Sequence, residues 1–386
     1  IISSLLSAQV VPCVSIQCQG TCDSYYELRL SGSTPNCLPY HGYVTVFRDD
    51  FDGNELDMQV WRPHSPLGGL VPDPNVIVSI PQNVVVQNGY ATLSTAWSPG
   101  FYNAWEWVYD SYGNIIPNYI YAQYNSAELW TFIYKFEEGR FHARCKLPNQ
   151  PQTNGAFWLW QESNDCKKEI DIFETLFDNT FPYKAFCSIH KVNDCSGNEL
   201  CNWSETFNSD LDKSQTFNEY VLEWDRNNVI WKFNNGQNTE VMRHDYSYWS
   251  SALGTQQNYC ADLATGYYIK HPIFPDHSYA MKLAFSHKPR GSFLNNPNVS
   301  SMQIDYVYVE KPINCSVQVD LCHALQNPTG DNFVLGGTIH VGGVGCDNEI
   351  HWDQYLKLFA TNEILISNEF EVIPNGIFTA EIVNCP

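Results

Sequence analysis

Residues 217–235 read FNEYVLEWDRNNVIWKFNN, two short runs rich in β-branched and aromatic residues on either side of Asn227 and Asn228. The runs EYVLEW (219–224) and VIWKF (229–233) are typical of β-strands, and an asparagine pair between two such runs is typical of a hairpin turn. This stretch therefore predicts an antiparallel hairpin.

Segments of the same kind extend in both directions, from Tyr43 to about Glu310, separated by Gly, Pro, Asn and Asp. Among them are VTVF (44–47), NVVV (83–86), YATLS (90–94), FHARCKL (141–147) and QIDYVYV (303–309). No long 3.6-residue periodicity competes with them. Many short strands divided by turn residues predict an all-β fold, a β-sandwich or jelly roll.

Composition divides the chain into three regions. Residues 1–42 hold four cysteines and few strand signals, so we expect a cysteine-rich N-terminal extension. The stretch IISSLLSAQVV at its start is either the tail of a signal peptide cleaved after Ala8 or a strand. Residues 43–311 form the main β domain. Residues 312–386 contain further strand-like runs, such as YLKLFAT (355–361), and predict a small disulfide-stapled β-sandwich without an internal repeat.

The charge balance limits the partners. Asp and Glu number 42 against 21 Lys and Arg, a formal charge of −21. Nucleic acid is disfavoured because few cations can replace its counterions. The same field repels sulfated polysaccharides and anionic membranes, so we expect a neutral partner. No apolar run reaches the ~18 residues that would predict a membrane-spanning helix.

The fourteen cysteines favour an oxidising compartment. They fall into an early block of four, a middle block of six and a late block of four, so we expect disulfides within blocks. Zinc is the rival explanation, but no CxxC pair recurs with His at ligand spacing. Asn-x-Ser sequons add the expectation of a secreted glycoprotein modified at Asn202, Asn298 and Asn314.

The segment KEIDIFE (168–174) concentrates the chemistry. Side chains alternate along a strand, so Glu169 and Asp171 share a face, whereas Glu174 has the wrong parity. A β-bulge near Phe173 would return Glu174 to that face. Three acids together are costly, since like charges raise one another's pKa. Retaining glycoside hydrolysis uses such a set, as a nucleophile and an acid/base about 5–5.5 Å apart.

This E-x-D-x-x-E motif resembles the bulged active-site motif of glycoside hydrolase family 16, which includes laminarinases, lichenases, agarases and carrageenases. The resemblance covers about residues 43–311. It includes the stretches FRDDFDGNELDMQVW (47–61), SAELWT (126–131), EGRFHARCKLP (138–148), GAFWLW (155–160), FNEYVLEWDRNNVIWKFNN (217–235) and MQIDYVYV (302–309). Phe173 stands where laminarinases carry Met, and the bulged spacing argues against the lichenase subgroup.

The resemblance implies a concanavalin A-like jelly roll with an open cleft. It implies that Glu169 is the nucleophile, Asp171 the assisting acid and Glu174 the acid/base. It also suggests four substrate-binding residues, Trp158, Trp160, His190 and Arg144, although core packing explains the tryptophans nearly as well and structural pairing would also explain the arginine. No cofactor is required, and a structural Ca²⁺ is compatible with the resemblance.

Two functions follow from these patterns. The first is a secreted retaining endo-β-glycanase or transglycosylase, with a β-1,3-containing glucan as expected substrate. The second is a non-catalytic glycan-binding or self-assembling extracellular protein on the same fold. Residues 312–386 faintly resemble transthyretin-like or immunoglobulin-like modules, and the N-terminal segment or this module could mediate self-association by strand addition.

Overall fold

The computed structural model describes 26 stretches of the chain and leaves the N-terminal region outside them. The described residues are 42–64, 70–71, 77–103, 108–109, 115–116, 119–148, 150, 152–161, 168–175, 184–192, 199–207, 212–225, 228–234, 236, 239–245, 260–261, 268–269, 280–289, 299–313, 315–316, 318–321, 333–342, 348–350, 355–366, 370–372 and 377–384. The predicted N-terminal extension and the sequons at Asn298 and Asn314 therefore lie outside the described residues. Asn202 lies in a strand, opposite His190.

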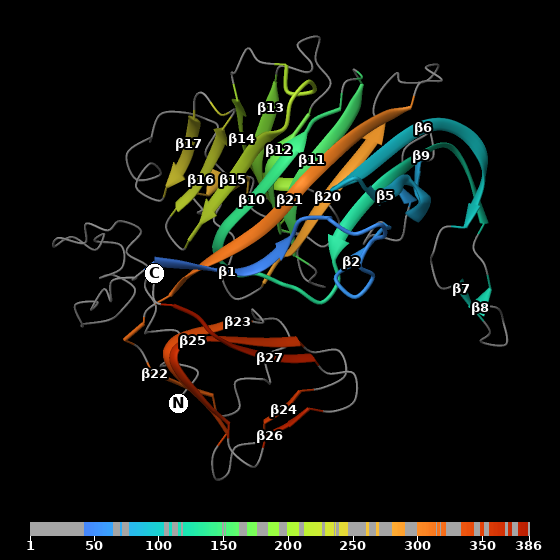
Figure 1. Cartoon of the computed structure of the whole chain (residues 1–386). Helices are drawn as coiled ribbons and strands as arrows, with labels where there is room; N and C mark the ends of the chain where they lie inside the picture. Colours follow the sequence, from blue (N-terminus) through green and yellow to red (C-terminus); the bar gives the residue numbers. More distant parts are fainter. Residues whose placement is uncertain are drawn as a thin grey trace.

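Two antiparallel sheets, joined through long strands, make up the main domain (Figure 1). The first, which we call the acidic sheet, has the order β2 (Trp61–Arg62), β9 (Tyr119–Thr131), β20 (Lys282–Pro289), β11 (Thr153–Trp160), β12 (Lys168–Glu174), β13 (Ala185–Val192) and β14 (Glu199–Phe207). Its strands bring residues far apart in sequence into one surface.

The second, which we call the opposite sheet, pairs the predicted hairpin with the first and last strands of the domain. Its order is β17 (Thr239–Asp245), β16 (Asn228–Asn234), β15 (Asn218–Trp224), β10 (Gly139–Lys146) and β21 (Ser300–Ile313), followed by β1 (Gly42–Asp49) and β6 (Tyr90–Asn103) along different parts of β21, and β5 (Val84–Gln87). The hairpin expected from residues 217–235 is present, because Trp224 pairs with Val229.

Shorter elements complete the domain. They are β3 (Leu70–Val71), β4 (Ile77–Ser79), the 3₁₀ helix η1 (Pro81–Asn83), β7 (Val108–Tyr109), β8 (Ile115–Ile116), β18 (Cys260–Ala261) and β19 (Tyr268–Ile269). The first half of β9 pairs with β6, and its last residues pair with β20. The all-β jelly-roll prediction is thus confirmed.

The core lies between the two sheets and is rich in aromatic side chains. Alternation places Phe157 and Leu159 of β11 inside, together with Tyr220 of β15 and Trp231 of β16, all fully buried. Phe157 stacks on Phe285 of β20, with ring centroids 4.6 Å apart. Since burial of apolar area is the main driving force of folding, this core fixes which strand faces point outward.

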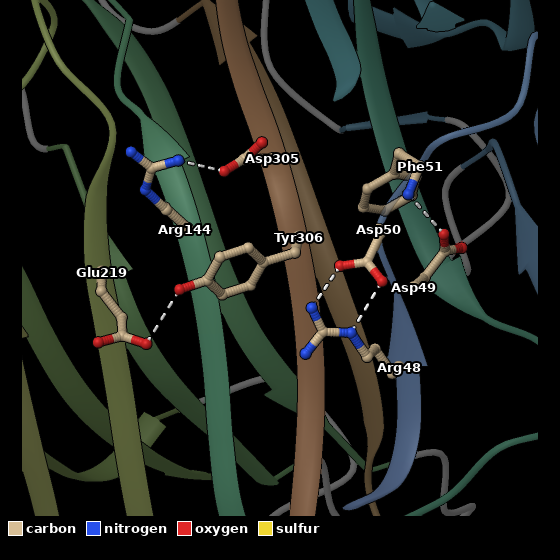
Figure 2. A network of polar contacts seen from close by, with 8 residues as sticks. All are labelled: Arg48, Asp49, Asp50, Phe51, Arg144, Glu219, Asp305 and Tyr306. Carbon is tan, nitrogen blue, oxygen red and sulfur yellow. Dashed lines mark hydrogen bonds and ion pairs between the residues drawn. The ribbon is translucent and has the colours of Figure 1, made fainter. Parts of the chain in front are cut away.

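The outer face of the opposite sheet carries a network of polar contacts (Figure 2). Arg144 of β10 pairs with Asp305 of β21, and Tyr306 of β21 donates a hydrogen bond to Glu219 of β15. His142 lies between Glu219 and Glu310 and stacks on Tyr308. These contacts connect three neighbouring strands by their side chains.

The C-terminal region forms small sheets of parallel strands (Figure 1). One contains β22 (Gln318–Leu321), β23 (Phe333–Val341), β25 (Tyr355–Ile366) and β27 (Ile377–Ile382), and the other contains β24 (Asn348–Ile350) and β26 (Phe370–Val372). Paired residues lie 20 to 25 positions apart, as in Gln318 with Thr338, Tyr355 with Ile377 and Thr338 with Glu363.

This arrangement differs from the transthyretin-like or immunoglobulin-like module that we expected, because those sandwiches are built from antiparallel strands. Strands that alternate between two sheets at a nearly constant spacing are instead typical of a β-solenoid, a repeat architecture. The sequence pattern missed this repeat because alternation indicates strands but not the direction in which they pair.

The C-terminal region shares a core with the jelly roll. Phe333 of β23 stacks on Phe136 and on Tyr134, with ring centroids 5.4 Å and 6.1 Å away, and Tyr355 of β25 packs edge-on to Tyr134 at 4.7 Å. Tyr134 and Phe136 lie between β9 and β10. The aromatic contact therefore fastens the small sheet to the connection that follows β9.

The cysteines of the middle block differ in part from the expectation. Cys145 is a buried free thiol, and the Sγ of the buried Cys187 lies 3.9 Å from the sulfur of Met242. Burial raises the pKa of the Cys145 thiol. Both residues face the core, where cysteine packs as a small apolar side chain. Cys315, in the late block, is disulfide-bonded.

Within the described part of the chain, no helix has the length and apolar character needed to cross a membrane.

Candidate active site

Strand β12 presents three acids on the face of the acidic sheet that points away from the core, which we call the acidic face. Ile170, Ile172 and Phe173 all belong to the core cluster. Asp171 pairs with Trp158 of β11, whereas Phe173 pairs with Phe157, so Ile172 is the extra residue of a β-bulge. The bulge expected near Phe173 is therefore present, and it returns Glu174 to the side of Glu169 and Asp171.

A buried indole from the opposite sheet supports this bulge. Trp231 of β16 donates a hydrogen bond from Nε1 to the backbone carbonyl of Asp171, at 2.9 Å. Trp231 is fully buried in the core between the sheets. A bulge interrupts the ladder of backbone hydrogen bonds, and a buried carbonyl without a partner would be costly. The indole therefore stabilises the bend that places Glu174.

His190 of β13 lies opposite Glu169 and reaches Asp171. Its Nε2 is 2.9 Å from Asp171 Oδ2, and ligand atoms of Glu169, Asp171 and His190 lie within 4.8 Å of one another. These three residues could hold a metal ion by distance alone. An imidazole nitrogen does not suit Ca²⁺, which prefers oxygen ligands, so the group gives no support to a structural calcium site.

Burial dominates the electrostatics of these acids. It raises the pKa of Glu169, and the neighbouring charge of Asp171 raises it further, while His190 and Lys288 oppose the rise. Burial also raises the pKa of Asp171, followed by the charge of Glu174, while the hydrogen bond from His190 acts in the other direction. A half-buried and a buried acid in contact hold a proton more tightly than either would in water.

Asn154 of β11 holds Glu174. Its side-chain Nδ2 donates to Glu174 Oε1 at 2.9 Å, and its Oδ1 accepts a hydrogen bond from the backbone N–H of Thr175. The Thr175 hydroxyl accepts a hydrogen bond from the Gly155 N–H at 2.8 Å. Behind Asn154, the buried His287 contacts its carbonyl through Nδ1, and burial lowers the pKa of His287 to about 4. The ring is therefore neutral at pH 7.

Three tryptophans form a separate apolar cluster on the acidic face. Trp130 of β9 and Trp158 and Trp160 of β11 pack with Ala156 and Ala284, and each tryptophan is under 10 % exposed. Trp158 pairs with Asp171, and Trp160 pairs with Glu169. Both predicted tryptophans thus lie beside the acids, although they are largely buried.

Arg144 lies elsewhere. Phe141, Ala143 and Cys145 of β10 face the core, so alternation turns Arg144 to the outer face of the opposite sheet, where it pairs with Asp305 (Figure 2). The structure therefore does not support its assignment to substrate binding, and structural pairing explains it. Of the predicted substrate-binding residues, Trp158, Trp160 and His190 adjoin the acids.

Sequence reasoning missed several residues in and behind the acidic face. Asn154 has the parity of Trp158 and could have been found by continuing the alternation along β11. Trp231 and Lys288 come from strands that are distant in sequence, and their contacts depend on pairing that no local pattern reveals. The residues missed on the acidic face are Trp130, Glu128, Asn154, Lys282 and Lys288, and Trp231 was missed in the core behind it.

Comparison with known proteins agrees with this geometry. Residues 101–257 match the family model described as glycosyl hydrolases family 16, and this segment includes β12 with its three acids. The chain therefore carries a glycoside hydrolase domain. Its residues 101–257 are the part that is similar to that family.

Solved structures resemble the chain over most of their own length. The laminarinase catalytic domain of Thermotoga maritima MSB8 is 19% identical with a TM-score of 0.49, over 71% of this chain and 100% of that one. An endo-1,3-β-glucanase catalytic domain of Thermotoga petrophila RKU-1 is 20% identical with a TM-score of 0.48, over 70% and 99%. The κ-carrageenase of Pseudoalteromonas carrageenovora is 16% identical with a TM-score of 0.47, over 78% and 100%. The chain matches no curated protein.

Proposed function

We propose that the protein is a secreted endo-β-glycanase that cleaves, or transfers, a β-linked polysaccharide with retention of configuration. The observation that carries this proposal is the bulge at Ile172, which gathers Glu169, Asp171 and Glu174 on one face beside His190. Acids gathered on one face make one another's ionisation less favourable. Such a face is a candidate for acid–base and nucleophilic chemistry.

In this proposal Glu169 is the nucleophile. Glu169 and Asp171 share a proton because burial raises the pKa of both carboxyl groups. When Asp171 holds that proton, Glu169 is the carboxylate that attacks the anomeric carbon. His190 supports this arrangement through its Nε2, which lies 2.9 Å from Asp171 Oδ2 and favours a negative charge there when the ring is protonated.

Glu174 is the general acid and base. Asn154 occupies its Oε1, so Oε2 is the oxygen that delivers a proton to the glycosidic oxygen as the bond to the anomeric carbon breaks. The attack forms an ester between Glu169 and the sugar. The Glu174 carboxylate then takes a proton from water, or from a sugar hydroxyl, which attacks the ester and releases Glu169. The two displacements together retain the β configuration.

Trp158 and Trp160 would contact the sugar beside the cleaved bond. Trp158 Nε1 is buried without a hydrogen-bond partner among the described residues, and a buried N–H of this kind suits a sugar hydroxyl as acceptor. The formal charge of −21 favours a neutral polymer, and we propose a β-1,3-containing glucan.

Two sequence features, the cysteines and the glycosylation sequons, support secretion. Fourteen cysteines, of which Cys315 is disulfide-bonded, fit an oxidising compartment. The sequons at Asn202, Asn298 and Asn314 fit a glycosylating pathway.

Release of reducing ends tests the proposal. The protein is incubated with laminarin, mixed-linkage β-glucan, agarose and κ-carrageenan, beside Glu169→Gln and a control, Glu223→Gln, on the opposite sheet. We expect release from a β-1,3-containing glucan, loss of about 100-fold or more in Glu169→Gln, and little change in the control. Binding without any release would instead point to the non-catalytic glycan-binding alternative.

A further inference from the structure

An ion pair with a buried carboxylate lies on the acidic face, apart from the three acids. Lys288 Nζ of β20 contacts Glu128 Oε1 of β9. The neighbours of Glu128 in its strand, Ala127 and Leu129, belong to the core, so Glu128 points to the acidic face. Glu128 is 2% exposed, whereas the side chain of Lys288 is 26% exposed and reaches solvent.

The second carboxylate oxygen of Glu128 takes no part in this ion pair. Glu128 Oε2 is buried and has no hydrogen-bond partner among the described residues. A buried ion pair is weak evidence for stability, because the cost of desolvating two charges offsets their attraction unless every oxygen is hydrogen-bonded. A buried carboxylate oxygen without a donor is therefore unfavourable for folding alone and suits a donor supplied by a ligand.

Strand register connects this oxygen to the cleavage site. Glu128 pairs with Ser286, Ser286 with Ala156, and Ala156 with Glu174, so all four side chains lie in one row across the sheet. Neighbouring strands are about 4.8 Å apart, which places Glu128 roughly 14 Å from Glu174 along the row. In this row, the small side chains of Ser286 and Ala156 stand between them.

An aromatic ring borders the row. Trp130 lies two residues beyond Glu128 on β9 and faces the same side, and Lys282 Nζ lies 4.2 Å from the centre of its ring. A carboxylate, an ammonium group and an aromatic ring around small side chains offer a sugar unit two kinds of contact, hydrogen bonds for its hydroxyls and an apolar surface for its ring.

We propose that Glu128 and Lys288 form a binding subsite for a neutral sugar unit of the same glycan, in the row of Glu174. Glu128 Oε2 accepts a hydrogen bond from one hydroxyl, and the Lys288 ammonium donates to the oxygen of the adjacent hydroxyl. A sulfate or carboxylate on that unit would face the Glu128 charge and is disfavoured. This subsite rests on the proposed glycanase function.

The test replaces the pair by apolar residues of similar size, Glu128→Leu with Lys288→Met. Such replacement of a buried pair leaves folding unchanged or improved. Affinity for a β-1,3-glucan hexasaccharide is measured by calorimetry in the Glu169→Gln background, and kcat and KM in the active protein. We expect unchanged unfolding temperature, affinity reduced about 10-fold or more, and a rise in KM.

The matched control is Glu223→Leu with Lys232→Met, a pair with a 2.7 Å contact on the opposite sheet, which should leave affinity unchanged. Should the first double variant fail to fold, Glu128→Met alone carries the test, because Lys288 can turn to solvent. Affinity equal to that of the parent protein overturns the subsite, as does tighter binding of a sulfated galactan oligosaccharide. If the active protein cleaves no β-glucan at all, the proposed function itself fails.

Discussion

At the scale of single residues, the carboxyl groups of the acidic face lower the stability of the folded protein when they ionise. Burial raises the pKa of both Glu169 and Asp171, and a neighbouring negative charge raises each further, that of Asp171 for Glu169 and that of Glu174 for Asp171. A carboxyl whose folded pKa lies above its unfolded pKa binds its proton more tightly when folded. The free energy of unfolding therefore decreases as the pH rises from the unfolded pKa through the folded one.

Glu169→Gln removes one of these ionisations while keeping a side chain that can donate to Asp171. We expect the variant to match the natural protein in stability near pH 4, where both carboxyls are protonated. At pH 8 it should be more stable by at least about 1 kcal/mol, since one pKa unit corresponds to about 1.4 kcal/mol. Urea unfolding at the two pH values measures this. A variant less stable at pH 8 than at pH 4, relative to the natural protein, would contradict the assigned cause.

At the scale of elements, one extra residue in β12 decides the site. The sequence predicted the three acids on one face and the need for a bulge, because both follow from the parity of a seven-residue segment. The contacts that hold the bulge could not be predicted, because Trp231 comes from the other sheet, 60 residues away along the chain. Arg144 also shows what could not be predicted. The family resemblance located its strand, but it did not reveal that the side chain lies on the outer face of the opposite sheet.

Trp231→Phe tests whether the indole positions the bulge. The change keeps an aromatic ring in the core and removes only the N–H that reaches the Asp171 carbonyl. We expect kcat on a β-glucan to decrease about 10-fold with KM nearly unchanged, and the pH profile to shift, because Asp171 and Glu174 move relative to each other.

The control for this substitution is Trp61→Phe, which removes the hydrogen bond of another buried indole, from Nε1 to Asp49 at 2.7 Å. Both variants should lose similar stability, about 1 kcal/mol for a net hydrogen bond. Equal kinetics in the two variants would mean that Trp231 is merely structural.

At the scale of the whole molecule, the sequence predicted a jelly roll with a small β module but not how the two meet. The described residues show an aromatic contact in which Phe333 and Tyr355 extend the jelly-roll core through Tyr134 and Phe136. Long-range packing of this kind leaves no local pattern. The parallel direction of the C-terminal strands was missed for the same reason, because it depends on which strands pair.

Phe333→Ala should therefore destabilise the jelly roll itself. Loss of a large buried aromatic side chain costs about 3–5 kcal/mol, and the missing ring leaves a cavity against Phe136. The control Leu358→Ala removes a side chain from the separate core of the small sheet. Calorimetry and residual activity are measured together as the temperature rises. Phe333→Ala should lower the temperature at which activity is lost, and Leu358→Ala should change that temperature much less. An unmoved jelly-roll transition in Phe333→Ala would show that the two regions are independent.

The central claim is that Glu169 attacks and Glu174 transfers the proton, and azide rescue tests it most directly. With an activated aryl β-glycoside, Glu174→Ala should still form the glycosyl-enzyme, because such a leaving group needs little protonation. Azide should then restore turnover and give the β-glycosyl azide, whereas in Glu169→Ala it should give the α-glycosyl azide from the vacated side. NMR of the two products assigns their configuration. The opposite configurations, or undiminished hydrolysis in either variant, would contradict the account.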